Sequence, residues 1–381
     1  MRRALLGLSA IVGLLCIFCS VSGAAAPALS VPSGFQIMRI GSVAGARELV
    51  AAPNGDLFVG TNGSDVYIIP HADSNRAGSP QVFVHVADAP SAGVTIANGA
   101  LFIGSQFGIW RLPYRLGQVH AVGTPAKIAS VRTSGVSRDH VTTTVAFTNG
   151  KLYASVGSSC NVCDPDLDST RATIQQMNPN GSSLSPRAIH IRNAIALAVN
   201  PATGSLWAGV AGQDELEPGH PYEIFDAVTL HAGVPDYGWP YCYENHRSTK
   251  PGHSCAATVV PRVIFPAYDT PIGAVFYPSN PTGRHIFPRR YWGGAFVTMH
   301  GSWHQPPVPP RVTFVPMRGD TPQKPADWSN PNTQWTEFVG SFQSATGDRI
   351  GRPTGVAVGP QGDLFVADDE ADAIYRIRAT R

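Results

Sequence analysis

The stretch from Pro360 to Ala367 reads PQGDLFVA, and nearly the same letters stand far away in the chain, where Pro53 to Gly60 read PNGDLFVG. Four further segments repeat this pattern of a Gly-containing turn followed by apolar and small residues, and they begin at Asn98, Asn149, Thr203 and Trp292. The glycine supplies the positive φ that a hairpin turn needs, and the residues after it suit a half-buried strand. Each copy therefore predicts a β-hairpin.

Three of the copies continue into a further strand-like segment, at residues 65–69, 108–112 and 373–377. Repeated units made only of strands are typical of propeller blades, because radial closure leaves only short exposed sheet edges. We therefore predict an all-β protein, a six-bladed β-propeller, in which a strand at 34–40 pairs near the strand at 373–378 and closes the ring. The longest gap between copies, from Leu206 to Ala295, predicts loops across one mouth of the channel.

The composition agrees with short strands joined by many turns. The chain has 381 residues, of which 39 are Gly, 33 are Pro and only 14% are charged, with a formal net charge of +2. Gly and Pro set turn conformations and interrupt helices. No run of Lys or Arg stands out, so nucleic acid is not an expected partner.

The first residues are typical of a secretory leader. Arg2 and Arg3 precede the apolar run Ala4–Val21, and Ser22–Ala24 are small residues at a cleavage site. We predict a signal peptide over 1–24, one propeller domain over 25–381, and a periplasmic or secreted protein. A membrane anchor is the alternative, although the run is short for a span, and no later segment is long and apolar enough to cross a membrane.

Four cysteines follow the leader, at positions 160, 163, 242 and 255. An even number in an exported chain predicts the pairing of Cys160 with Cys163 and of Cys242 with Cys255. Cys-x-x-Cys is also the spacing of a zinc site, which stays the alternative, although a second such motif is missing.

Polar clusters stand beside the predicted blade strands, and they are Arg138–His140, Arg192–Asn193 and His300–His304. A His at the end of a sheet suits a general base, because its pKa lies near neutrality, and a His bonded to backbone is the alternative. An Arg–Asn pair binds a carboxylate or quinone oxygen, or else satisfies buried carbonyls. Trp303 stacks on a flat ligand or packs a corner.

These clusters resemble the soluble quinoprotein glucose dehydrogenase and L-sorbosone dehydrogenase family of six-bladed propellers. The resemblance runs from about Pro32 to the C-terminus, and its most specific stretches are KLYASVGSSCNVC at 151–163, DYGWPY at 236–241, AFVTMHGSW at 295–303 and GRPTGVAVGPQGDLFVADDEADAIYRI at 351–377. It implies an exported oxidoreductase that uses pyrroloquinoline quinone (PQQ) and calcium to oxidise a sugar, sugar alcohol or sugar aldehyde and passes electrons to an external acceptor.

The resemblance also implies roles for single residues. His140 takes the place of the catalytic base, and Arg192 that of an arginine over the cofactor. Further cofactor-binding positions are Arg47, Asn193, Asp214, His300, Trp303 and Arg352. The carbonyls of Gly212 and Gln213 take the place of calcium ligands. Thr143 and Thr354 stand where relatives carry arginines, which predicts weaker PQQ binding than is usual in the family.

Two other functions share this fold in principle. One is a non-catalytic propeller that has lost its cofactor and binds a carbohydrate or a protein. The other is a calcium-dependent, lactonase-like hydrolase, since fold alone does not decide chemistry. Convergence of His140, Arg192, Asn193 and Arg352 on one channel mouth would favour the dehydrogenase.

Overall fold

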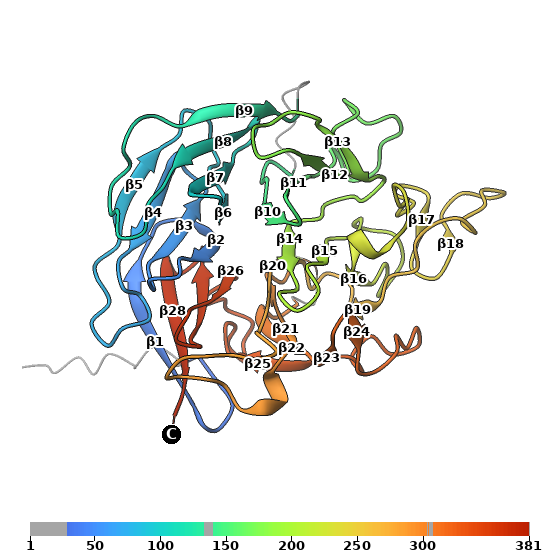
Figure 1. Ribbon diagram of the computed structural model, residues 1–381. Helices are drawn as coiled ribbons and strands as arrows, with labels where there is room; N and C mark the ends of the chain where they lie inside the picture. Colours follow the sequence, from blue (N-terminus) through green and yellow to red (C-terminus); the bar gives the residue numbers. More distant parts are fainter. Residues whose placement is uncertain (1–28, 133–139, 303, 305–307, 381) are drawn as a thin grey trace, which may run out of the picture.

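The computed structural model describes residues 29–132, 140–302, 304 and 308–380, so the predicted leader, Arg138, Asp139 and Trp303 lie outside the described residues. Six four-stranded antiparallel sheets stand around a central axis as the blades of a β-propeller (Figure 1). The predicted fold class is confirmed. The structure is all-β apart from two three-residue 3-10 helices in the described part of the chain, η1 (Val228–Leu230) and η2 (Arg289–Tyr291).

Each blade runs from an inner strand at the axis to an outer strand at the rim. The inner strands are β2 (Ala46–Ala51), β6 (Gly93–Ala97), β10 (Val145–Thr148), β14 (Ala196–Val199), β20 (Pro271–Phe276) and β26 (Pro353–Val358). The second strands are β3 (Leu57–Thr61), β7 (Ala100–Gly104), β11 (Lys151–Val156), β15 (Leu206–Val210), β21 (Ala295–Met299) and β27 (Leu364–Asp368).

The third strands are β4 (Asp65–Ile69), β8 (Gly108–Pro113), β12 (Thr173–Met177), β16 (Glu223–Asp226), β22 (Arg311–Val315) and β28 (Ala373–Ala379). The outer strands are β5 (Gln81–His85), β9 (Ala126–Ser130), β13 (Ser185–Ala188), β19 (Val263–Phe265), β25 (Thr336–Val339) and β1 (Phe35–Ser42). Two small hairpins lie outside the blades, β17 (Cys242–Tyr243) with β18 (Arg247–Ser248) and β23 (Met317–Arg318) with β24 (Thr321–Pro322).

The ring is closed by the two ends of the described chain. Strand β1 is the outer strand of the last blade and pairs antiparallel with β28, with Phe35 opposite Ala379 and Ser42 opposite Ala373. The predicted closure is therefore confirmed. It removes the free edge that either terminal strand would otherwise expose.

The inner strands approach one another closely around the axis. A Cβ on Gly93 would lie 2.3 Å from the carbonyl oxygen of Thr143, and one on Gly355 would lie 2.2 Å from that of Arg47. Only glycine fits where neighbouring backbones come this near. The blades thus hold the start of each inner strand, where the site residues stand, in a fixed position relative to its neighbours.

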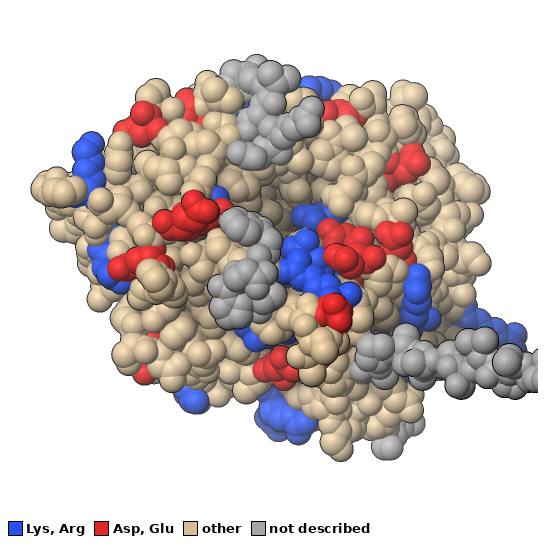
Figure 2. All heavy atoms as spheres, turned by 180° about the vertical axis from the view of Figure 1, so that it is seen from behind, with Lys and Arg blue, Asp and Glu red and all other residues tan. Residues whose placement is uncertain are grey.

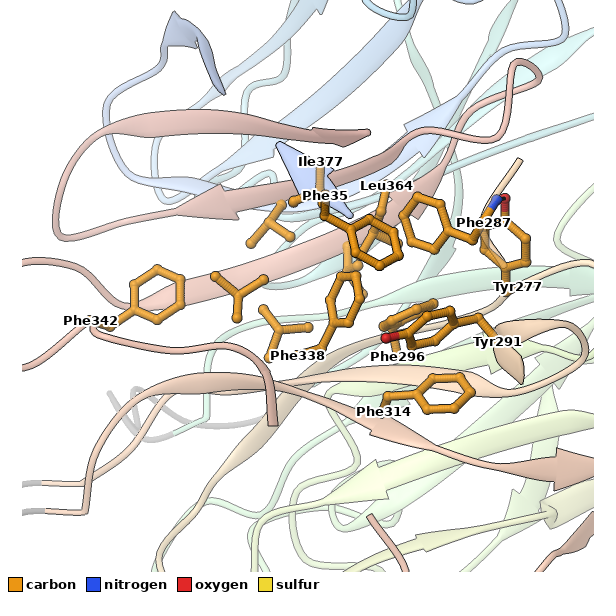
Figure 3. Close-up of a cluster of buried hydrophobic side chains, with 14 residues drawn as sticks. Phe35, Tyr277, Phe287, Tyr291, Phe296, Phe314, Phe338, Phe342, Leu364 and Ile377 are labelled. Atoms are coloured by element: carbon orange, nitrogen blue, oxygen red, sulfur yellow. Dashed lines mark hydrogen bonds between the residues drawn. The ribbon is translucent and has the colours of Figure 1, made fainter. Parts of the chain in front are cut away.

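The core lies between the blades, and its largest aromatic cluster joins the last two blades to β1 (Figure 3). Phe35 from β1 makes edge-to-face contacts with Phe287, Tyr291 and Phe338, at centroid distances of 4.7, 5.4 and 5.1 Å. Such contacts add to the free energy gained by burying the rings. Phe35 therefore fastens the closing strand to the blade beside it.

Replacing Phe35 by alanine should lower the free energy of unfolding by about 3–5 kcal/mol, because it leaves a cavity where four rings meet. Urea unfolding followed by tryptophan fluorescence measures this change. Gln36→Ala, at the exposed neighbouring position of the same strand, is the control and should change stability by less than about 0.5 kcal/mol. Equal free energies of unfolding for Phe35→Ala and wild type would show that Phe35 does not hold β1 against the neighbouring blade.

Both predicted disulfides are present. Cys160 is bonded to Cys163 and Cys242 to Cys255, with Cα atoms 6.1 and 5.6 Å apart. The zinc alternative at these cysteines is therefore wrong, because all four sulfur atoms are used. In the described part of the chain, no helix has the length and apolar character needed to cross a lipid bilayer.

Candidate active site

Antiparallel pairing gathers the predicted site residues at one mouth of the channel. An inner strand begins where the second strand of its blade ends, so residues before the first and after the second share one end of the propeller. His140, Arg192, Asn193 and Arg352 precede inner strands, and Arg47 lies at the start of one. Gly212, Gln213, Asp214 and His300 follow second strands. Figure 2 shows basic and acidic side chains around a central hollow on this face.

His140 is held by a hydrogen bond that selects its tautomer. Its Nδ1 lies 2.9 Å from the carbonyl oxygen of Ser158 and 3.0 Å from the Ser158 hydroxyl. A carbonyl can only accept, so Nδ1 carries the hydrogen and Nε2 keeps its lone pair. Burial, together with the nearby charge of Arg192, lowers the pKa of His140 to about 3. The imidazole is therefore neutral at physiological pH.

A glycine lets His140 and Asn193 approach each other. A Cβ on Gly157 would lie 2.5 Å from the Cβ of His140 and 2.6 Å from the Oδ1 of Asn193. Gly157 belongs to the stretch KLYASVGSSC. Any side chain at this position would push the two residues away from their observed places.

Arg132, which the sequence analysis missed, clamps the segment that carries His140. Its side chain is almost fully buried and donates to the carbonyls of Gln106, His140 and Thr142 at 2.9, 2.8 and 2.5 Å, and to the hydroxyl of Thr143. Burial lowers the pKa of Arg132 to about 9, which leaves it charged at neutral pH. Because its acceptors are mainly backbone carbonyls, no motif in the sequence marks it.

A second buried arginine supports the other side of His140. Arg171 donates to the carbonyls of Gly157 and Ser158, at 3.2 and 3.4 Å. Ser158 is the residue whose carbonyl holds His140. Arg132 and Arg171 thus fix the base and its acceptor, and both of their charges lower the pKa of His140 further.

Arg192 is fixed by contacts on every side of its guanidinium. Nη1 donates to the carbonyls of Gly212 and Ala211, and Nη2 donates to Asn161 Oδ1 at 2.9 Å and forms an ion pair with Asp214 at 3.2 Å. The side chain is 6% exposed. The structure therefore brings Arg192 together with two more predicted site residues, Gly212 and Asp214.

A second cluster forms across the first, fifth and sixth blades. Asp369 accepts from Arg47 Nη1 at 3.1 Å and from His300 Nε2 at 2.9 Å. Arg352 Nε donates to the carbonyl of His300 at 3.1 Å. Burial lowers the pKa of His300 to about 4 although Asp369 opposes the shift, so His300 is neutral at pH 7. The sequence analysis missed Asp369, whose only signal is a pair of aspartates at the end of the last repeat, 368–369.

The two threonines that stand in place of arginines are structural. Thr143 accepts from Arg132, and the Thr354 hydroxyl donates to the carbonyl of Ala46 at 2.8 Å. Neither side chain is exposed. Neither position therefore offers a charge to a ligand in the mouth.

Glu48 is a buried acid next to this second cluster. It is 6% exposed, and its Oε1 has no hydrogen-bond partner in the described structure. Burial raises the pKa of Glu48 to about 8, against the opposing charge of Arg47. The carboxyl group is therefore mostly protonated at neutral pH.

The raised pKa of Glu48 predicts a pH-dependent gain from Glu48→Gln. The folded protein binds the Glu48 proton more tightly than the unfolded chain does. Protonated Glu48 therefore stabilises the folded wild type fully below about pH 4.5, and this stabilisation is lost as the pH rises through about 8. The stability of Glu48→Gln relative to wild type should therefore increase between pH 5 and pH 8. Urea unfolding at both pH values measures it, with the exposed Glu337→Gln as control. A difference in stability between Glu48→Gln and wild type that does not change with pH would contradict the raised pKa of Glu48.

Comparisons with known proteins agree with the fold. Residues 222–380 match the TrAA12-like family. An uncharacterized protein from Borreliella burgdorferi is 25% identical over 234 residues, which cover 60% of this chain and 57% of that protein, so the match spans less than three fifths of the relative's length.

Three solved structures superpose over nearly the whole chain. The iodide structure of Trichoderma reesei carbohydrate-active enzyme family AA12 is 19% identical, with a TM-score of 0.77, and the match covers 93% of this chain and 98% of that one. The holo form of the pyranose dehydrogenase PQQ domain from Coprinopsis cinerea is 17% identical, with a TM-score of 0.78 and coverages of 94% and 99%. The PQQ-bound aldose sugar dehydrogenase from Streptomyces coelicolor is 17% identical, with a TM-score of 0.60 and coverages of 92% and 99%.

The expected resemblance is confirmed: the chain is a six-bladed β-propeller similar in fold to PQQ-dependent sugar dehydrogenases, and its residues 222–380 match the TrAA12-like family.

Proposed function

We propose that this protein is an exported oxidoreductase that oxidises a sugar, sugar alcohol or sugar aldehyde, with PQQ as the hydride acceptor and His140 as the general base. The observation that carries the proposal is the neutral His140, whose Nε2 lone pair is left available by the bond from Nδ1 to Ser158, in one cluster with Asn193 and Arg192. Export rests on the predicted leader and is consistent with the two disulfides.

The residues at the mouth suit an anionic, planar cofactor. Arg47, Arg192 and Arg352 stand in these clusters against Asp214 and Asp369. Arg132 and Arg171 are buried behind the segment that carries His140 and add positive charge from there. The Nε of Arg47 is buried and has no partner in the described structure. An excess of positive charge with an unused donor is what carboxylate groups need. Arg47, Asn193, Asp214, His300 and Arg352 are the residues we propose to hold PQQ.

The proposed chemistry assigns a separate task to each residue. PQQ, when bound, supplies the carbon that accepts a hydride from the substrate. His140 Nε2 takes the proton of the substrate hydroxyl or hydrated aldehyde, for which a neutral imidazole is required. Arg192 keeps a fixed positive charge beside the reacting groups, where it stabilises negative charge without reorganisation. The electrons then leave to an external acceptor.

Calcium binding by the carbonyls of Gly212 and Gln213 stays a prediction, and the contacts that Gly212 makes bear on it. The carbonyl of Gly212 accepts from the Arg192 guanidinium, and the Gly212 N–H donates to buried Glu223 at 2.6 Å. A cation at this carbonyl would lie close to the Arg192 guanidinium, and repulsion between the two positive charges disfavours its binding unless Arg192 moves. The Gly212 carbonyl as it stands does not fit calcium, and no step is assigned to the ion.

A titration with PQQ tests the cofactor assignment. Wild-type protein should bind PQQ at micromolar concentration, followed by the absorbance of the quinone. Arg192→Ala should weaken binding by about tenfold or more, because it removes a fixed positive charge beside the anionic cofactor. The exposed Arg76→Ala is the matched control and should bind like wild type. Failure of wild type to bind PQQ would overturn the dehydrogenase assignment and favour a propeller without this cofactor.

A further inference from the structure

A groove lies beside the candidate active site, over the third and fourth blades. It encloses about 780 Å³, within the range of pockets that take organic ligands. One wall is the loop 163–173 and the other is the loop 238–258, which carries β17 and β18, and Ile189, His190 and Asp236 lie between them. All of these residues belong to the described part of the chain.

Both walls are fixed, so the groove exists before any ligand binds. Cys160–Cys163 braces the first wall and Cys242–Cys255 the second. The indole of Trp239 joins the walls by donating to the carbonyl of Asn161 at 3.0 Å. A preformed groove loses little conformational freedom when it binds.

The groove shares a wall with the catalytic cluster. The carbonyl of Asn161 that accepts from Trp239 also accepts from Arg192 Nε at 3.3 Å. Arg171 lines the groove and also donates to the carbonyls of Gly157 and Ser158 beside His140. A ligand in the groove therefore lies one side chain away from the candidate base.

The lining of the groove offers both hydrogen-bond donors and acceptors, and acidic side chains are in excess. His190 and Asp236 form a pair at 2.9 Å, and this hydrogen bond, with Asp164 nearby, raises the pKa of His190. Tyr241 and His253 add rings whose centroids are 5.2 Å apart. Four aspartates line the groove, at 164, 166, 168 and 236, against Arg171, so the lining disfavours an anion and offers carboxylate acceptors to hydroxyl groups. It suits a neutral ligand rich in hydroxyl groups that also presents C–H faces to rings.

We propose that this groove binds a neutral carbohydrate chain, so that the protein acts on the end of an oligosaccharide whose following sugar units lie between the two disulfide-braced walls. The substrate class rests on the proposed function, whereas the groove itself does not depend on the cofactor. His190 and Tyr241 are the residues expected to contact the chain.

Calorimetric titration of the protein without PQQ tests the groove, with maltohexaose, cellohexaose and xylohexaose as probes. At least one hexaose should bind to wild type. Tyr241→Ala and His190→Ala should each raise its Kd by about tenfold, the usual effect of losing one ring contact or hydrogen bond. His85→Ala is the matched control, because His85 forms the same kind of exposed pair with Asp65, at 2.9 Å, on the first blade.

Two results would overturn carbohydrate binding in the groove. Either no hexaose binds to wild type, or the two groove variants, Tyr241→Ala and His190→Ala, bind it as tightly as His85→Ala does. Thermal unfolding confirms that the variants are folded. Oxidation of monosaccharides without hexaose binding would reject the groove and keep the dehydrogenase. Hexaose binding that is weakened by the groove variants, without oxidation of any sugar, would keep the groove and reject the dehydrogenase.

Discussion

Replacing His140 by alanine is expected to lower kcat by about 10²–10⁴-fold, the usual contribution of a general base. The reason is geometric, because Nδ1 donates to the Ser158 carbonyl and Nε2 is left as the acceptor. Binding of PQQ, followed by absorbance, should be largely retained. Steady-state dye reduction with a sugar substrate measures kcat, and His85→Ala serves as the control.

The low pKa of His140 adds a pH test of the same residue. Its ring should stay neutral from neutrality down to about pH 4, since the folded pKa is about 3. The pH–rate profile of wild type should therefore lack an acid limb near 6.5, where an ordinary His titrates. A limb near 6.5 that disappears in His140→Ala would contradict the buried neutral ring. An unchanged kcat in His140→Ala would reject the residue as the base.

Arg132→Met is expected to lower kcat by about 10²-fold, because the segment 140–143 loses the guanidinium that fixes it and a displaced base costs about this much. KM should change little, since Arg132 is buried and lies against the chain rather than in the open mouth. Arg132→Lys should restore part of the rate, because it keeps the charge but cannot reach four acceptors.

The pH profile separates positioning from a general loss of stability in Arg132→Met. The charge of Arg132 lowers the pKa of His140, so its removal should raise that pKa and bring an acid limb toward neutrality. Arg132→Lys keeps the charge and should not move the limb. A folded Arg132→Met with wild-type kcat and the wild-type profile would show that the clamp does not act on the base.

Much of the fold follows from the sequence for a local reason. A turn followed by a strand of fixed pattern marks each blade in the sequence, as at Pro53–Gly60 and Pro360–Ala367. This pattern is sufficient because a hairpin forms between segments that are neighbours in the chain. The closing pair of β1 and β28 was also predictable, because a ring of six leaves two ends that must pair. The β17–β18 insertion carries no repeat signal, and its position over the fourth blade depends on long-range contacts such as the bond from Trp239 to Asn161.

The candidate site was predictable to the extent that its residues flank repeated strands. His140 and Arg192 could be found because each precedes an inner strand, whereas Arg352 was implied only by the family resemblance. Arg132, Arg171 and Asp369 could not, because their partners are backbone carbonyls or side chains distant in sequence. The sequence likewise does not reveal that the Gly212 carbonyl is taken by Arg192. Trp303 lies outside the described residues, and its contact with a cofactor stays a prediction.

The central claim is that this propeller oxidises a sugar with PQQ at the mouth that holds His140. The most direct measurement is reduction of an artificial dye by the protein mixed with PQQ and a panel of aldoses, sugar alcohols and sugar aldehydes, with calcium present and absent. We predict reduction that requires both PQQ and a sugar and that is lost in His140→Ala. PQQ-loaded protein that reduces no dye with any member of the panel would contradict the account.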